Sequence, residues 1–99
     1  MKLLSGQSSV QAHVYISGRV QGVFFRVFVR QKALELGVTG YVRNLRDRRV
    51  EAVFQGPPDK VQEMIKQVHE GPRLARVEKV SVQWEAVSEE FINNFQIRY

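Results

Sequence analysis

The stretch Gly18-Arg19-Val20-Gln21-Gly22-Val23-Phe24-Phe25-Arg26 connects two segments with different hydrophobic periodicities. Before it, the apolar residues Ala12, Val14 and Ile16 alternate with others, as in a half-buried β-strand. After it, apolar residues recur at helical spacing. We therefore expect a turn that leads from a strand into a helix, around which the rest of the chain is arranged.

This turn has the features of an anion-binding loop. Gly18 and Gly22 can adopt backbone conformations that other residues avoid, so that successive N–H groups point into one concavity at a helix N-terminus. Arg26 is expected in the first helical turn, and its guanidinium suits a tetrahedral oxyanion such as phosphate. Taken alone, however, this glycine spacing is more often only a tight connection, and an arginine at such a position is usually solvated.

Composition narrows the possible classes of protein. With 99 residues, 43% of them hydrophobic, the chain fits one compact domain with a single core. The absence of cysteine excludes disulfides, thiolate zinc sites and cysteine-nucleophile phosphatases. A net charge of +5 favours anionic partners. No apolar run approaches the ~20 residues that cross a bilayer, so we expect a soluble protein without membrane contact. We further expect a cytoplasmic monomer.

Residues 1–10 contain too short an apolar run for a signal peptide, and we expect them to form a flexible N-terminal extension. Residues 11–99 are expected to form the folded domain. Within it, a first helix is indicated by apolar residues on one face, followed by a capping glycine: Phe25, Phe28, Val29, Ala33, Leu36 and then Gly37.

The remaining chain is expected to form a two-stranded hairpin, a second helix and two further strands. Residues 39–45 and 50–55 are predicted strands, joined as a hairpin by residues 46–49. A second helix follows Gly56-Pro57-Pro58-Asp59 and ends near Gly71. A strand from Ala75 onward, with a bulge near Glu78, and a short strand ending at Tyr99 complete the chain.

The predicted order is strand, helix, strand, strand, helix, strand, strand. Such a chain can bury its apolar faces by placing both helices on one face of a mostly antiparallel sheet of four to five strands. The expected fold class is therefore α+β, a ferredoxin-like split βαβ sandwich. Because this fold hosts many unrelated functions, it does not by itself indicate an activity.

Few side chains are arranged for acid, base or metal chemistry. The two histidines, His13 and His69, are not expected to lie in a cluster of carboxylates, and we interpret both as structural or solvated. The acidic residues are spread along the chain without metal-ligand spacing, which argues against a metal-dependent phosphatase. Asn44 lies late in a strand, where asparagine is disfavoured. It either begins the turn or orients a nucleophilic water toward an anion in the loop.

At these two sites the sequence resembles the acylphosphatase family. The family's phosphate loop is matched by residues 18–26, and its second-strand motif by Gly40-Tyr41-Val42-Arg43-Asn44. The similarity continues through Val50-Glu51, Phe54-Gln55-Gly56-Pro57, Gly71-Pro72 and Phe95-Gln96-Ile97-Arg98-Tyr99. One departure is Arg48, at a hairpin position where the family usually has glycine.

The resemblance implies hydrolysis of small acyl phosphates to carboxylate and inorganic phosphate, without metal or cofactor. It implies that Arg26 and the loop residues Arg19, Val20, Gln21, Gly22, Val23, Phe24 and Phe25 bind the phosphoryl group, and that Asn44 orients the water. This fits the absence of a general acid, because a carboxylate with a conjugate-acid pKa of about 4 leaves without a proton at pH 7.

Two other functions fit parts of the sequence. RNA-recognition motifs share the order of elements and a basic surface, but their third strand carries several aromatic residues for base stacking. Here that strand, residues 49–55, has a glutamate and one aromatic residue, and we do not expect nucleic acid as a partner. A catalytically silent domain that binds an acyl phosphate or regulates a partner is the second alternative, against which the presence of Arg26 and Asn44 argues.

Overall fold

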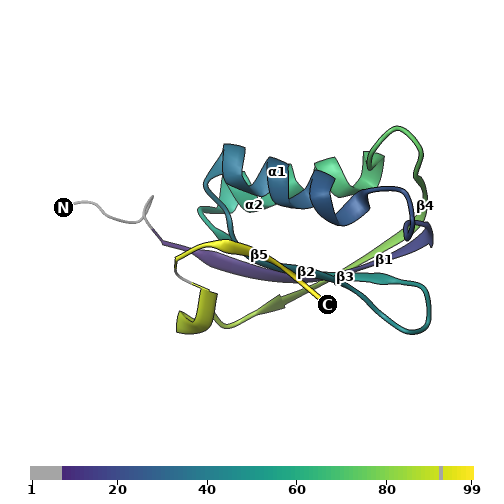
Figure 1. Ribbon diagram of the computed structural model, residues 1–99. Helices are drawn as coiled ribbons and strands as arrows, with labels where there is room; N and C mark the ends of the chain where they lie inside the picture. The colour runs from purple at the N-terminus through teal and green to yellow at the C-terminus, as the bar shows by residue number, and fades with distance from the viewer. Residues whose placement is uncertain (1–7, 92) are drawn as a thin grey trace.

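Two helices cover one face of a five-stranded sheet in the computed structural model, which describes residues 8–91 and 93–99 (Figure 1). In chain order the elements are β1 (Val10–Arg19), α1 (Phe25–Leu36), β2 (Thr39–Asn44), β3 (Val50–Gly56), α2 (Pro58–Glu70), β4 (Arg76–Glu85), the 3-10 turn η2 (Glu89–Phe91) and β5 (Phe95–Arg98). The predicted α+β, ferredoxin-like arrangement is confirmed.

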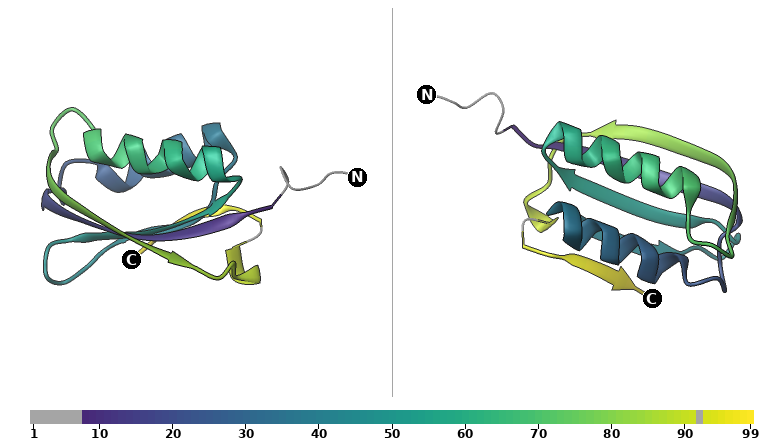
Figure 2. Two further views of the ribbon diagram at one scale, coloured as in Figure 1. Left: turned by 180° about the vertical axis from the view of Figure 1, so that it is seen from behind. Right: turned by 90° about the horizontal axis from the view of Figure 1, so that it is seen from above.

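The strands lie in the order β4-β1-β3-β2-β5. β1 pairs antiparallel with both β3 and β4, and β2 pairs antiparallel with β3. The last strand is the exception, because β5 runs parallel to β2 at the edge of the sheet. The right-hand view of Figure 2 shows the two helices side by side above the sheet, with β5 along the edge nearer α1.

The core lies between the helices and the sheet. Alternate residues of the central strands point toward the helices and are buried, as are the apolar residues on the facing sides of the helices: Ala12, Val14, Ile16, Val50, Ala52, Phe54, Val29, Ala33, Val61, Met64 and Val68. Each large side chain buried in this way stabilises the fold by roughly 1.5–3 kcal/mol relative to an exposed one. This core holds the two ends of the loop at residues 20–24 in place.

The start of the predicted domain differs by one residue. Val10, which we expected in the flexible extension, pairs with Gly56 and is the first residue of β1. Residues 1–7 of the predicted extension lie outside the described residues. Among the described residues, no helix is long and apolar enough to cross a membrane.

Gly18 allows β1 and β4 to approach closely beside the loop. Its φ is 124°, and a Cβ atom there would lie 2.2 Å from the carbonyl oxygen of Arg76. The pairing shifts here, since Ser17 is opposite Lys79 and Gly18 is opposite Val77. The expected bulge near Glu78 is thus present, and it ends the regular pairing just before the chain turns toward α1.

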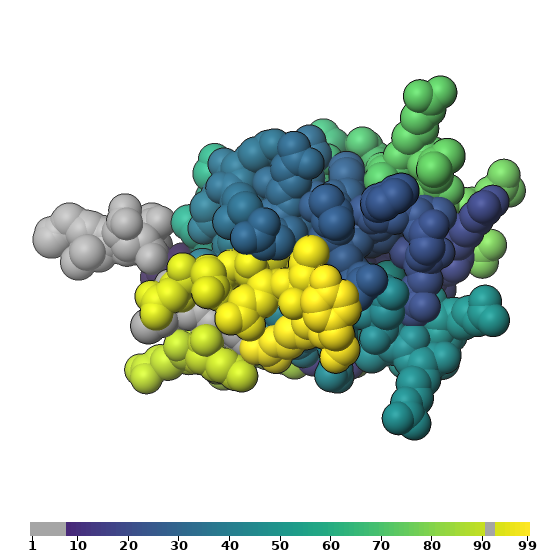
Figure 3. All heavy atoms as spheres, viewed as in Figure 1, coloured from purple at the N-terminus to yellow at the C-terminus, as the bar shows by residue number. Residues whose placement is uncertain are grey.

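The β2–β3 hairpin closes through backbone hydrogen bonds. Leu45 N–H donates to the Arg49 carbonyl at 2.8 Å, and Arg48 N–H donates to the Leu45 carbonyl at 3.2 Å. Arg48 has a φ of 80°, in the left-handed region where glycine is favoured. The chain therefore keeps the turn conformation without the glycine, at a conformational cost of roughly 1–2 kcal/mol. This loop projects beyond the body of the molecule (Figure 3, teal, lower right).

The sheet face away from the helices carries a cluster centred on His13. Its Nε2 atom is 2.7 Å from Glu51 Oε2, and its Nδ1 atom is 2.7 Å from Glu85 Oε2. The expectation that His13 lies outside any cluster of carboxylates is therefore wrong. Strand pairing brings together three residues that are far apart in the sequence, and their positions along the chain do not reveal this contact.

This geometry shifts the pKa values of the cluster. Burial disfavours the charged form of His13, but hydrogen bonds to Glu51 and Glu85 outweigh it and raise the pKa of His13 above its usual value. Burial likewise opposes ionisation of Glu51, yet its hydrogen bonds to His13 and Arg43 lower its pKa. With a carboxylate at each ring nitrogen, the imidazolium form of His13 can donate one hydrogen bond to Glu51 and one to Glu85.

The cluster predicts a pH-dependent contribution to stability. Because the pKa of His13 is raised in the fold, its contribution is fully present below the unfolded pKa of about 6.5 and is lost as pH rises through the folded pKa. Urea unfolding should show that His13→Gln costs more at pH 6 than at pH 9, by up to roughly 3 kcal/mol, the upper range for a hydrogen bond to a charged group. His69→Gln is the control, and an equal cost for His13→Gln at both pH values would contradict the prediction.

Candidate active site

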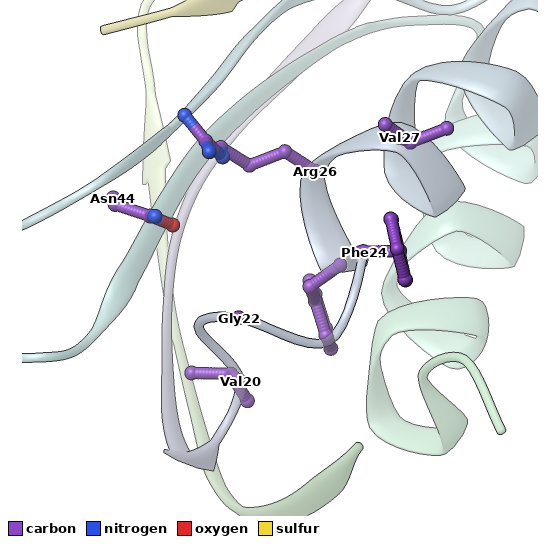
Figure 4. Close-up of a pocket in the computed structure, with 7 residues that line it drawn as sticks. Val20, Gly22, Phe24, Arg26, Val27 and Asn44 are labelled. Carbon is purple, nitrogen blue, oxygen red and sulfur yellow. The ribbon is translucent and has the colours of Figure 1, made fainter. Parts of the chain in front are cut away.

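A pocket of about 240 Å³ lies where the loop of residues 20–24 enters α1 (Figure 4). It is lined by Val20, Gly22, Phe24, Phe25, Arg26, Val27 and Asn44. The loop and the end of β2, which were expected to act on the same anion, thus line one pocket. Its volume is below the roughly 300–1,000 Å³ of pockets for drug-sized molecules, and it therefore suits a small ligand.

The loop reaches α1 with its backbone donors unused. Gly22 and Phe24 have φ values of 74° and 64°, both left-handed. The N-terminus of α1 has no side-chain cap and no acidic residue in its first turn. Among the described residues, no backbone carbonyl accepts a hydrogen bond from the N–H groups of Gly22, Val23 or Phe24. Donors of this kind at a helix N-terminus, together with the helix dipole, favour an anion.

Arg26 supplies the positive charge of the pocket. It is half-buried, and its guanidinium lies 5.0 Å from the centre of the Tyr99 ring. None of the ion pairs between described residues involves Arg26. The guanidinium is thus oriented by an aromatic contact while its N–H donors remain available for an oxyanion. In Figure 4 its side chain extends from the start of α1 toward the strand that carries Asn44.

Asn44 presents an acceptor to the pocket. It is the last residue of β2 and pairs with Val50 of β3, so its backbone is held by the hairpin. Its Oδ1 atom is buried and has no hydrogen-bond partner among the described residues. Leaving a buried acceptor unpaired costs roughly 1–3 kcal/mol, which the fold itself does not explain. A hydrogen-bond donor bound in the pocket would satisfy this oxygen.

Gln21 connects the loop to the hairpin. Its Nε2 atom donates to the Leu45 carbonyl at 2.8 Å and to the Arg49 carbonyl at 2.9 Å. The side chain therefore fixes the loop relative to the residue that follows Asn44. Sequence reasoning placed Gln21 in the loop but missed this contact, because its acceptors are backbone carbonyls that carry no residue-specific signal.

Two of the predicted loop residues, Arg19 and Val23, are not among the residues that line the pocket. The Arg19 side chain is exposed at the end of β1, and the Val23 side chain is buried in the core. For these residues, any contact with an anion would come from the backbone. Within residues 8–91 and 93–99, no three His, Asp or Glu side chains are placed to hold a metal ion together.

Comparison with known proteins identifies the family. Residues 12–97 match the family model described as Acylphosphatase. The chain belongs to the acylphosphatase family. An acylphosphatase of Roseiflexus sp. is 59% identical over 75 residues, which are 76% of this chain and 81% of that protein.

Solved structures of acylphosphatases have the same fold as this chain. The structure of an acylphosphatase from Coxiella burnetii has a TM-score of 0.88 at 37% identity, over 96% of this chain and 100% of that one. Acylphosphatase from Bacillus subtilis has a TM-score of 0.87 at 34% identity, over 91% and 99% of the two chains. The resemblance and the fold expected from the sequence are thus confirmed.

The two hydrogen bonds of Gln21 predict a specific loss of stability. Gln21→Glu keeps the shape of the side chain but replaces the donor by an acceptor that faces two carbonyl oxygens. The free energy of unfolding in urea should fall by about 1–3 kcal/mol, the cost of unpaired groups. Gln96→Glu adds the same charge at an exposed position of β5 and is the matched control. Equal stability of both variants would show that the Gln21 contact does not hold the loop.

Proposed function

We propose that this chain hydrolyses the carboxyl-phosphate bond of small acyl phosphates, releasing a carboxylate and inorganic phosphate. The observation that carries the proposal is the unpaired, buried Oδ1 atom of Asn44 in the same pocket as Arg26. The Arg26 guanidinium suits an anion, and Asn44 Oδ1 suits a water molecule. These are the two reactants in the hydrolysis of a phosphoryl compound. Membership of the acylphosphatase family supports the same reaction.

In the proposed mechanism, the phosphoryl group binds at the N-terminus of α1. Its oxygens accept hydrogen bonds from the loop amides between Gln21 and Arg26 and from the Arg26 guanidinium. These donors are held in place before the substrate arrives, so they stabilise charge on the equatorial oxygens without reorganisation during the reaction. This arrangement is the main source of rate enhancement for a group transfer that needs little covalent chemistry from the protein.

Asn44 orients the attacking water in this mechanism. A water O–H donates to Oδ1, which turns the water's lone pair toward phosphorus. Since transfer of a phosphoryl group passes through a loose transition state, the water needs positioning more than activation by a base. The leaving carboxylate needs no proton, because its conjugate acid has a pKa of about 4. Accordingly, the pocket needs no acidic side chain, and none of the described residues that line it is acidic.

The proposed partners are small anionic substrates and inorganic phosphate, with the chain acting as a cytoplasmic monomer without cofactor. Nucleic acid is disfavoured by the open face of the sheet. On β3, the central strand of that face, Glu51 is bonded to His13 and Arg43 and occupies a strand on which an RNA-recognition motif carries aromatic residues that stack bases.

Substrate selectivity tests the proposal. A site without a general acid should cleave acetyl phosphate well and glycerol phosphate barely, because each pKa unit of an unassisted leaving group adds up to about 1.4 kcal/mol to the barrier. Phosphate release from both compounds is measured at equal protein concentration, with and without EDTA. Similar rates on both compounds, or activity lost in EDTA and restored by magnesium, would overturn the proposal. No release from either would favour the silent domain.

The roles of the two side chains can be separated by mutation. Arg26→Ala should lose both turnover and inhibition by inorganic phosphate, since a hydrogen bond to a charged group contributes roughly 1.5–3 kcal/mol. Asn44→Ala should lower kcat by about 10² or more and leave inhibition by phosphate within a few-fold.

Lys66→Ala and Asn93→Ala, at exposed positions away from the pocket, are the matched controls for this pair. If Asn44→Ala hydrolyses acyl phosphates at the rate of the parent, Asn44 does not orient the water and serves only in the turn.

A further inference from the structure

The pocket has an apolar side that the proposed chemistry does not use. Phe24 and Val27 line it, yet the two residues are 75% and 55% exposed. In Figure 4 both side chains lie on the side away from Asn44, whereas Arg26 extends toward the strand that carries Asn44. The pocket therefore has a polar half suited to an anion and an exposed apolar half beside it.

The backbone of Phe24 is strained for an aromatic residue. With φ 64° and ψ 26°, it occupies the left-handed region that glycine adopts freely. An exposed ring gains little from packing, so the core does not explain why a large side chain occupies this position. Backbone strain of this kind is concentrated at ligand-binding and active sites, where it is retained for function.

The geometry of phosphoryl transfer gives this apolar half a role. The attacking and leaving oxygens lie roughly in line on opposite sides of phosphorus. If Asn44 holds the water, the leaving oxygen and the acyl group bonded to it extend away from Asn44. In the structure, that is the side on which Phe24 and Val27 lie.

We propose that Phe24 and Val27 form an acyl-binding surface, and that the chain prefers carboxyl phosphates with an aromatic acyl group over those with a short aliphatic one. The inference rests on the proposed function and names the substrate class for the same site. Phe24 offers a ring face or edge to an aromatic acyl group, and Val27 extends the apolar contact. Because α1 holds Val27 and the loop holds Phe24, the surface is in place before the substrate binds.

The test compares benzoyl phosphate with acetyl phosphate. The ratio of their kcat/KM values is measured for the parent, Phe24→Ala, Phe24→Gly, Phe24→Tyr and Val27→Ser. The ratio cancels any general loss of activity, and comparing the ratio between the parent and each variant cancels the intrinsic difference between the leaving groups. We expect it to fall about tenfold in both Phe24→Ala and Phe24→Gly, to fall less in Val27→Ser and to be retained in Phe24→Tyr. The change should appear mainly in KM for benzoyl phosphate, as expected for lost binding contacts.

Two controls separate recognition from other effects. Leu34→Ala removes an exposed apolar side chain elsewhere on α1, and Arg48→Gly relieves a left-handed residue outside the pocket; neither should change the ratio. An unchanged ratio in Phe24→Ala and Val27→Ser, with both compounds still hydrolysed, would overturn the acyl-binding surface alone. A fall in Phe24→Gly but not in Phe24→Ala would also overturn it, because loop conformation would then be the cause. Failure of the parent to hydrolyse either compound would instead overturn the proposed function.

A second measurement tests the surface without turnover. Phenylphosphonate and methylphosphonate share the anionic group and lack a cleavable bond. Calorimetric titration should show tighter binding of phenylphosphonate to the parent by about tenfold, and this advantage should disappear in Phe24→Ala. Equal affinity of the parent for both compounds would contradict the inference even if acyl phosphates are hydrolysed.

Discussion

The start of α1 is the constraint on which the rest of the site depends. The helix follows a strand after only five residues and begins without a side-chain cap, so its first N–H groups point away from the protein's own acceptors. Gly18 lets β1 approach β4, and the left-handed residues Gly22 and Phe24 then turn the chain into the helix. A more conventional cap would satisfy these donors and would remove their capacity to bind an anion.

Unpaired groups are concentrated at this end of the molecule. The open face of the sheet shows the contrast, because its buried polar side chains are bonded to one another. Gln55 Nε2 donates to Gln11 Oε1 at 2.9 Å, and Glu51 is paired with both His13 and Arg43. Asn44 Oδ1 is left without a partner in the described part of the chain. Every other buried side-chain N or O atom of the described residues has a hydrogen-bond partner. The unpaired Asn44 Oδ1 atom is therefore an exception that points to a bound molecule.

Rigid elements place these groups. Arg26 lies in the first turn of α1, whose buried face packs against the sheet, and Asn44 ends a strand paired on both sides. Gln21 joins the loop to the hairpin through two hydrogen bonds, which fix the loop relative to the end of β2. Preorganisation of this kind suits a reaction in which positioning and electrostatic stabilisation supply most of the rate enhancement.

The sequence by itself determined the elements, the fold class and the two candidate sites, because periodicity, glycine and proline positions and two local motifs report short-range physics. Arg26 could be found in this way, since its role depends on a helix start that is visible in the chain. Three features could not be found from the sequence: the parallel pairing of β5, the His13 cluster and the two hydrogen bonds from Gln21 to the hairpin. Only the tertiary structure decided them, because each depends on which distant segments become neighbours in the sheet. The same holds for the apolar half of the pocket, where Phe24 is exposed by a backbone conformation that its residue type would not predict.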